Sequence, residues 1–320
     1  MQVSQLLAGL TSGNRVALAK AITLVESNNP IHRRTALDLL SQLPSKASAL
    51  RIGICGTPGA GKSTLIEALG MLCIAKGKRP AVLAMDPSSI QFGGSILGDK
   101  TRMPNLGVSL QAYVRPSPTR GVLGGVTTSC SEAIRICEAA GHDPIIIETV
   151  GLGQSETTVD SVTDLVMMVT SPAAGDGLQG IKKGIMEIAD IVVMNKVDGP
   201  LEKKAGHAKL ELEGSIRLNM RRYEEWTPRV VTCSALLQVN IEEVWSTLLE
   251  ARGTLEQWIA KKRAWQNMSQ AEQILDSLLK ERVTDLKTLP EYQALNLRLR
   301  RGLVLPRQAA YQLLSMLGPN

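Results

Sequence analysis

The chain has 320 residues, a formal net charge of +6 at pH 7, and hydrophobic side chains at 44% of its positions. This content suffices to bury a large core and indicates a globular protein with one main domain plus smaller additions. Aromatic residues make up only 3% of the chain, which argues against a nucleic-acid-binding protein, because such proteins combine basic residues with stacking rings. We find no apolar run of membrane-span length and no secretory signal, so we expect a cytoplasmic protein with no membrane partner.

The first part of the chain has a helical pattern. Apolar residues recur at helical spacing through residues 16–24 and again through residues 36–40. The Pro- and Ser-containing stretch 43–48 that follows is typical of a linker. We therefore expect residues 1–48 to form an N-terminal helical segment.

A glycine-rich loop comes next, between the short apolar run 51–55 and the helically spaced run 65–69. Strand, glycine loop and helix, in this order, form the context in which the GxxxxGK[ST] pattern binds phosphate. Backbone N–H groups then point at one centre, and the helix N-terminus adds positive potential. We expect Lys62 to contact the β- and γ-phosphates and the Ser63 hydroxyl to ligate Mg²⁺. The predicted phosphate-binding residues are Gly56, Thr57, Pro58, Gly59, Ala60, Gly61, Lys62, Ser63 and Thr64.

Two further apolar runs end in carboxylates. Residues 80–85 lead into Asp86, and residues 143–147 lead into Glu148. A carboxylate at the end of a strand beside the phosphate loop orients Mg²⁺ directly or through water. We expect Glu148 and Asp86 on the metal side of the site, with Asp99 in a Gly-rich segment as a third candidate. A helix or turn cap is the alternative role for Asp86 and Asp99.

A fourth apolar run, residues 190–194, leads into Asn195, Lys196 and Asp198. These residues predict which base the nucleotide carries. An Asp carboxylate accepts hydrogen bonds from N1–H and the 2-amino group of guanine, whereas adenine has neither donor. We expect Asn195 to brace the loop and the Lys196 stem to lie over the purine. The backbone N–H groups expected near guanine O6 belong to Ser234, Ala235 and Leu236, which follow the run 229–232. The predicted ligands are therefore GTP and GDP.

Strands alternate with helices from residue 49 to about residue 250, which predicts an α/β fold: a mostly parallel P-loop NTPase sheet flanked by helices. After the last strand, apolar residues keep helical register through residues 241–259, a segment that we expect to be too long for its neighbours to cover. We expect residues 251–320 to form a C-terminal helical arm. This arm either pairs with a second copy of the chain or folds back on its own core.

Several longer segments of the sequence are more specific for one protein family than the phosphate and base loops are. They lie at residues 85–89, 93–103, 115–125, 148–156, 175–190 and 305–314. In these segments the chain resembles the MeaB/ArgK-type GTPases associated with methylmalonyl-CoA mutase, within the signal-recognition and MinD-related class. The resemblance implies a slow, homodimeric GTPase that acts as a chaperone of an adenosylcobalamin-dependent mutase. Such proteins gate cofactor loading and guard the mutase against inactivation.

The resemblance also implies roles for single residues. It puts Lys62, Ser63, Asp86, Asp99 and Glu148 around the γ-phosphate and Mg²⁺, and it marks residues 176–183 as a third mobile loop that responds to the partner. We expect the catalytic residues to be Lys62, Glu148, Gln154 and Lys182, and the switch residues to be Gly151, Asp176, Gln179 and Lys182. From the residues alone, Lys182 is either a charge that reaches the phosphates or the start of a surface helix.

Two other function classes stay open. The first is a nucleoside-triphosphate-dependent kinase of a protein or of an arginine/ornithine transport system. Such a kinase needs a base for the acceptor's proton, and we find no such constellation beside the phosphate loop. The second is a metallochaperone, which is disfavoured because the five cysteines and three histidines form no ligand cluster in the sequence.

Overall fold

The computed structural model describes residues 2–27, 29–44, 49–86, 103–118, 123–149, 155–172, 183–218 and 222–317. The chain divides into two compact units, residues 1–266 and residues 267–320, and each is described by itself. The predicted domain boundaries at residues 48 and 250 stay predictions. The observed division lies further along the chain, after Gln266, and the N-terminal helices belong to the same unit as the sheet.

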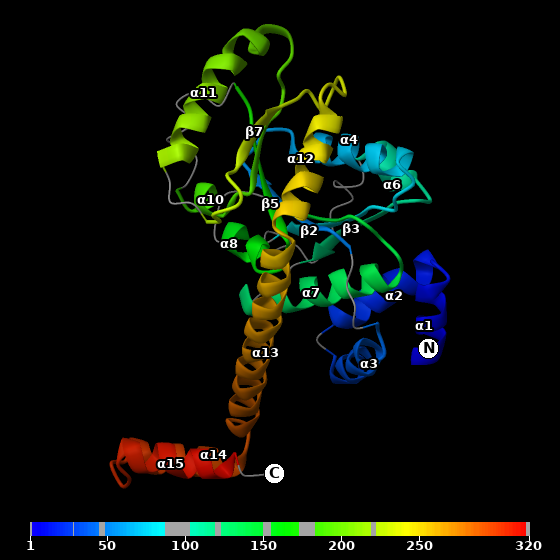
Figure 1. The fold of residues 1–320 in the computed structure, drawn as a ribbon. Helices are drawn as coiled ribbons and strands as arrows, with labels where there is room; N and C mark the ends of the chain where they lie inside the picture. Colours follow the sequence, from blue (N-terminus) through cyan, green and yellow to red (C-terminus); the bar gives the residue numbers. More distant parts are fainter. Residues whose placement is uncertain are drawn as a thin grey trace. The chain divides into compact units, whose positions relative to one another are not determined.

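Seven strands form one sheet at the centre of the first unit, in the order β3-β2-β4-β1-β5-β6-β7 (Figure 1). The strands are β1 (Arg51–Gly56), β2 (Ala81–Asp86), β3 (Tyr113–Pro118), β4 (Ile145–Thr149), β5 (Leu165–Thr170), β6 (Ile191–Met194) and β7 (Arg229–Thr232). Every pair of neighbouring strands is parallel. The predicted α/β class with a P-loop NTPase sheet is therefore confirmed, although β3 and β5 were not among the predicted strands.

One face of the sheet is covered by helices from both halves of the first unit. These helices are α1 (Val3–Thr11), α2 (Arg15–Val25), α3 (Pro30–Ser41), α7 (Leu123–Ala139), α8 (Ser155–Asp160), α10 (Lys183–Ile188) and α11 (Glu202–Leu218). Leu18 of α2, Ile134 of α7 and Val159 of α8 belong to one hydrophobic core with the strands, and each is almost fully buried. The N-terminal helices are thus part of the sheet's packing on this face.

Polar contacts fix the N-terminal helices further. The Asn14 side chain caps α2 by accepting hydrogen bonds from the N–H groups of Val16 and Ala17, at 2.9 and 3.1 Å. Arg115 of the edge strand β3 donates to the Ala19 carbonyl of α2 at 3.2 Å and forms an ion pair with Glu26. The helical segment predicted from the sequence is therefore tied to the sheet edge by charge as well as by burial.

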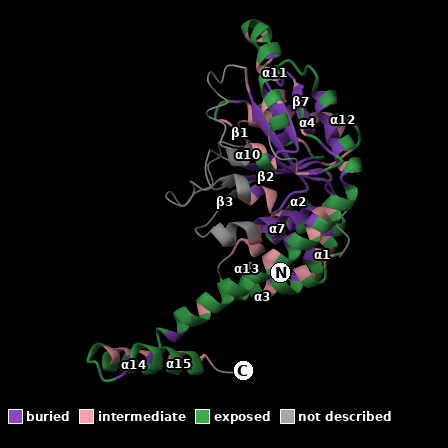
Figure 2. Ribbon diagram, turned by 60° about the vertical axis from the view of Figure 1, so that its left-hand side comes forward, coloured by how far each residue is buried: buried purple, intermediate pink, exposed green. Residues whose placement is uncertain are grey.

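The opposite face of the sheet carries α4 (Lys62–Ala75), α6 (Pro104–Val108) and α12 (Ile241–Thr254). Side chains alternate along β1, so that Ile52 and Ile54 belong to the core under these helices while Cys55 belongs to the other core. Figure 2 shows the strands as a buried layer between the helices. The described part of this unit also contains a short 3₁₀ helix, η2 (Gly199–Leu201).

The helical spacing of apolar residues through residues 241–259 arises from a different structure from the one expected. It covers two helices, α12 and α13 (Glu256–Leu286), which meet at Leu255. Ile241, Val244, Leu248 and Leu255 are all buried in the core that α12 shares with the sheet. The expectation that neighbours cannot cover this segment is therefore wrong for residues 241–255, which pack on the sheet, whereas Trp258 of α13 is 42% exposed.

The second unit contains the later part of α13 together with α14 (Pro290–Arg300) and α15 (Pro306–Met316). Its buried hydrophobic cluster consists of Leu295, Val304 and Ala309. Among the residues that the structure describes, no helix combines the length and the apolar character that a membrane crossing requires.

Candidate nucleotide-binding site

The glycine-rich loop connects β1 to α4, and two of its glycines are required by close neighbours. Gly56 has φ +139°, and a Cβ there would lie 2.0 Å from the Val169 carbonyl oxygen of β5. Gly61 has φ +87°, and a Cβ there would lie 2.6 Å from Asn195 Nδ2. Both positions combine a left-handed backbone with a space that only hydrogen fits, so glycine is dictated by geometry.

Lys62 lies at the first turn of α4 and turns its ammonium group back over the loop. Its Nζ donates hydrogen bonds to the carbonyl oxygens of Gly56 at 3.0 Å and Thr57 at 3.3 Å. Pro58 and Gly59, at the tip of the loop, are exposed. A cation, an open loop and the N–H groups of a helix N-terminus therefore meet at one place, which is an arrangement suited to a phosphate group.

The metal side of the predicted site is built by α4 and β4. Ser63 Oγ donates a hydrogen bond to Glu148 Oε1 at 2.9 Å, and Glu148 is only 5% exposed. Glu148 lies opposite Ile54 of β1 and Ala84 of β2, so Asp86 follows two residues later at the same edge of the sheet. A hydroxyl and a carboxylate at this separation are hard oxygen ligands, and they fit Mg²⁺.

The buried side chain of Asn195 joins the phosphate loop to the loop after β7. Its Nδ2 donates to the carbonyl oxygens of Ala60 at 3.0 Å and Gly61 at 3.3 Å. Its Oδ1 accepts from the N–H of Ala235 at 2.9 Å and from Cys233 Sγ at 3.7 Å. One amide therefore uses both ends to fix the distance between two loops that are far apart in sequence.

Asp198 lies beside the same loop, and its carboxylate is held by a protein hydroxyl. Ser234 Oγ donates a hydrogen bond to Asp198 Oδ2, and the N–H of Leu237 donates to Ser234 Oγ at 3.3 Å. Two backbone hydrogen bonds between Ser234 and Val239, at 3.0 and 3.1 Å, close this loop. Lys196 is exposed next to it with φ +65°.

The structure therefore brings one group of predicted residues to the carboxyl ends of β1, β4, β6 and β7. This group consists of the loop 56–64, Glu148, Asn195, Asp198 and Ser234–Leu236. Asp86 ends β2 at the same edge. Asp99, Gly151, Gln154, Asp176, Gln179 and Lys182 lie outside the described residues. Sequence reasoning assigned only backbone groups to the loop after β7 and missed the Ser234 hydroxyl, for which the spacing carries no signal.

Comparison with known proteins identifies the family. The family model described as methylmalonyl Co-A mutase-associated GTPase MeaB matches residues 18–288. The chain belongs to the MeaB family. It is therefore a P-loop GTPase, as the phosphate and base loops predicted, and the resemblance stated from the sequence is confirmed.

Individual relatives agree with this assignment. A probable GTPase of Mycobacterium tuberculosis is 47% identical over 319 residues, which cover 98% of this chain and 95% of that protein. GTPase ArgK of Escherichia coli is 46% identical over 84% of both chains. The mitochondrial methylmalonic aciduria type A homolog of Mus musculus is 47% identical over 78% of this MeaB-family chain and 62% of that protein.

A solved structure supports the fold along almost the whole chain. The crystal structure of an LAO/AO transport system kinase has a TM-score of 0.73 and 34% sequence identity, and the match covers 98% of this chain and 97% of that one.

The contact between Ser234 and Asp198 generates a first prediction about base recognition. We expect Asp198→Asn to weaken GTP binding by roughly 10²-fold or more, because the amide keeps one acceptor oxygen but places an N–H donor opposite the second guanine donor. The same variant is expected to favour xanthosine triphosphate, whose 2-oxo group accepts from the new amide. Competition of both nucleotides against a fluorescent GDP derivative measures this change.

Ser234→Ala provides the matched control. It removes the hydroxyl that holds Asp198 but keeps the carboxylate, so we expect about tenfold weaker GTP binding with the preference for guanine retained. An Asp198→Asn protein that binds GTP as tightly as the wild type contradicts the assignment of Asp198 to guanine.

Proposed function

We propose that this GTPase is a chaperone of an adenosylcobalamin-dependent methylmalonyl-CoA mutase. It gates loading of the cofactor and protects the mutase, and it works in the cytoplasm. The observation that carries the proposal is the match of the MeaB family model across residues 18–288, since its description names association with that mutase. The name of the mouse relative, a methylmalonic aciduria type A homolog, supports the same metabolic setting.

The proposed chemistry uses residues of the phosphate and metal sides. Lys62 and the N–H groups of the loop 56–64 bind the β- and γ-phosphates, while Asp198 selects guanine. Ser63 and Glu148, with Asp86 and Asp99, hold Mg²⁺, which supplies positive charge to the phosphate oxygens when bound. The 2.9 Å contact between Ser63 Oγ and Glu148 Oε1 supports this metal assignment.

A second prediction tests the metal assignment. Ser63→Ala removes one oxygen ligand, so we expect the Mg²⁺ concentration for half-maximal GTP hydrolysis to rise at least about tenfold. A Mg²⁺ titration of phosphate release measures it. The matched control is Ser246→Ala, which deletes an exposed hydroxyl bonded to the Glu243 carbonyl of its own helix and leaves the titration unchanged. Coincident titrations for Ser63→Ala and the wild type exclude Ser63 as a ligand.

A third prediction tests the role as a chaperone. A switch GTPase hydrolyses slowly alone and faster with its partner, so we expect a methylmalonyl-CoA mutase from the same cell to raise GTP hydrolysis at least about tenfold. Replacement of Gln179 and Lys182 by Ala is expected to blunt that rise and to leave GDP binding intact. Steady-state phosphate release with and without the mutase is the measurement.

Lys204→Ala, which removes an exposed lysine of α11, serves as the control for loss of surface charge and is expected to keep the stimulation. Equal turnover with and without the mutase, together with no co-elution in any nucleotide state, contradicts the chaperone proposal. That outcome favours the second candidate function, a transport-system kinase, which is supported by the similarity of this chain to the LAO/AO transport system kinase.

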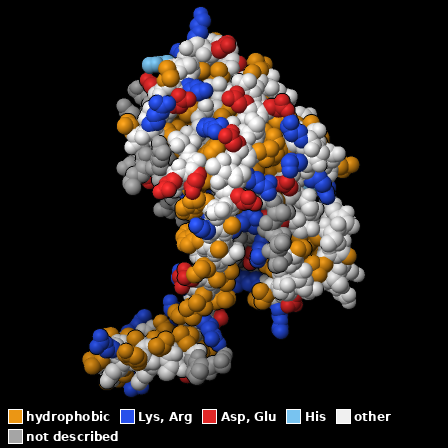
Figure 3. Space-filling view, in the orientation of Figure 1, with side chains coloured by type: hydrophobic (Ala, Val, Ile, Leu, Met, Phe, Trp, Pro, Cys, Tyr) orange, Lys and Arg blue, Asp and Glu red, His pale blue; other side chains and the backbone are white. Residues whose placement is uncertain are grey.

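We further propose that the second unit pairs with its counterpart in a homodimer. Its described part has a small core of Leu295, Val304 and Ala309, while many of its large apolar side chains are exposed. Leu275, Leu278 and Leu279 share one face of α13 and are 50–56% exposed. Figure 3 shows hydrophobic side chains gathered on the surface of this unit. So short a unit needs more burial than its own core supplies.

A fourth prediction follows for the assembly. We expect the full chain to have the mass of a dimer by light scattering, and the double variant Leu275→Lys, Leu279→Lys to have that of a monomer, because buried charges disfavour the interface. Leu210→Lys, at an exposed leucine of α11, is the control and is expected to stay dimeric. A monomeric wild-type chain at micromolar concentration contradicts the homodimer.

A further inference from the structure

Two short helices lie between the edge of the sheet that carries the candidate nucleotide site, called the nucleotide edge below, and a group of buried charged side chains around Asp160. Helix α8 follows β4, which carries Glu148, and helix α10 follows β5; each has six residues. The two helices contact each other, and α8 also packs on β1. A Cβ at Gly53 of β1 would lie 2.7 Å from Val159 Cγ2, so α8 lies directly against the strand that leads into the phosphate loop.

The ends of both helices are bound by one arginine. Arg222 Nη1 donates to the carbonyl oxygen of Ile188, the last residue of α10, at 3.0 Å. Its Nη2 donates to both carboxylate oxygens of Asp160, the last residue of α8, at 2.8 and 3.1 Å. A displacement of either helix therefore changes the contacts of the same guanidinium group.

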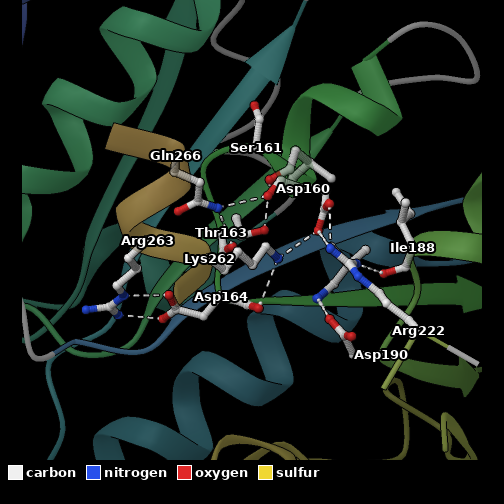
Figure 4. A network of polar contacts seen from close by, with 12 residues as sticks. Asp160, Ser161, Thr163, Asp164, Ile188, Asp190, Arg222, Lys262, Arg263 and Gln266 are labelled. Carbon is white, nitrogen blue, oxygen red and sulfur yellow. Dashed lines mark hydrogen bonds and ion pairs between the residues drawn. The ribbon is translucent and has the colours of Figure 1, made fainter. Parts of the chain in front are cut away.

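Asp160 also binds the first turns of α13 (Figure 4). Lys262 Nζ donates to Asp160 Oδ1 at 2.7 Å and to the Asp164 carbonyl oxygen at 3.1 Å, and its side chain is only 7% exposed. Gln266 Nε2 donates to the carbonyl oxygens of Asp160 at 3.0 Å and Thr163 at 2.9 Å. Burial raises the pKa of Asp160, but Lys262 and Arg222 together lower it below its ordinary value.

A second anchor of α13 has a different attachment. Arg263 donates to both carboxylate oxygens of Asp164, at 2.7 and 2.6 Å, and to the Ala49 carbonyl oxygen at 2.7 Å. Asp164 Oδ2 in turn accepts from the N–H of Arg51, at the start of β1, at 2.9 Å. Lys262 thus ties α13 to the end of α8, whereas Arg263 ties it to Asp164, just before β5, and to Ala49, just before β1.

We propose that the chain of contacts Arg222–Asp160–Lys262 couples the state of the nucleotide to α13. Helix α8, which ends at Asp160, packs on β1 and β4, the strands that lead into the phosphate loop and carry Glu148, so it moves as one body when these strands adjust to the ligand. Because α13 is a single helix from Glu256 to Leu286, a change in its first turns enters the helix that continues into residues 267–320. This inference requires GTP binding, which family membership establishes, and it does not require the mutase.

The fifth prediction tests this coupling by reciprocity. If the contact at Asp160 differs between the GDP and GTP states, removing it changes the relative affinities for the two nucleotides. We expect Lys262→Met to change the ratio of the dissociation constants for GDP and a non-hydrolysable GTP analogue by at least about fivefold. Methionine keeps the apolar stem without the charge, and Asp160 keeps its pair with Arg222. Isothermal titration of both nucleotides to the full-length protein measures the ratio.

Hydrogen exchange supplies a second readout that a purely structural role does not move. In the wild type we expect the amides of residues 256–266 to exchange at different rates with GDP and with the GTP analogue. In Lys262→Met this difference is expected to vanish. Asp160→Asn, which has nearly the same volume as the native residue, provides a second variant with the same expected outcome if Lys262→Met does not fold.

Arg263→Gln is the matched control. It removes an ion pair of α13 that is also largely buried, so a comparable loss of melting temperature is expected, but its partners are the Asp164 carboxylate and the Ala49 carbonyl oxygen and not Asp160. We expect the nucleotide ratio of this variant to equal that of the wild type. An unchanged ratio in Lys262→Met, or an equal change in Arg263→Gln, overturns the proposal. If the wild-type protein binds neither GDP nor the GTP analogue, that result contradicts the GTPase assignment itself and not the coupling alone.

Discussion

The candidate site depends on the buried amide of Asn195. It donates to the carbonyls of the phosphate loop and accepts from the backbone N–H of Ala235, so it sets the separation of the phosphate and base loops. A buried amide left without one partner costs about 1–3 kcal/mol, which makes this separation stiff. The same side chain explains Gly61, because its Nδ2 occupies the space of a Cβ there. A residue 134 positions away thus constrains the sequence of the phosphate loop.

Local patterns made the phosphate and base loops predictable. In a parallel sheet every strand presents its carboxyl end at one edge, so short motifs that follow apolar runs converge there without knowledge of the strand order. The two strands that were not predicted lack such local signals. Pro116 and Pro118 argue against a central strand, but β3 is an edge strand, where proline is tolerated. The run Leu165–Thr170 is fully buried and has the composition of either a strand or a buried helix.

Contacts between distant residues were not predictable. Lys262 lies 102 positions from Asp160, and in sequence it is one of several basic residues on a long helix, a pattern typical of a solvated surface. Only the fold shows that it is buried against a carboxylate. The boundary between α12 and α13 at Leu255 was not predictable either, because the apolar residues keep their helical spacing across it. The spacing of apolar residues predicts which face of a helix is buried, but it does not predict which element packs against that face.

The chemistry at Asp160 is better suited to transmission than to stability. Buried ion pairs gain little over hydrophobic packing of the same volume, because desolvation offsets the attraction between the charges. Stability alone therefore does not account for two cations and a glutamine around the end of a six-residue helix. Charged contacts can be broken one at a time, since Lys262 Nζ donates to the Asp160 carboxylate at 2.7 Å and to the Asp164 carbonyl oxygen at 3.1 Å and can lose the first while it keeps the second. A packed apolar contact cannot lose one partner and keep another in this way. In the proposed coupling, Arg263 keeps the same helix attached to Asp164 and Ala49 while α8 adjusts.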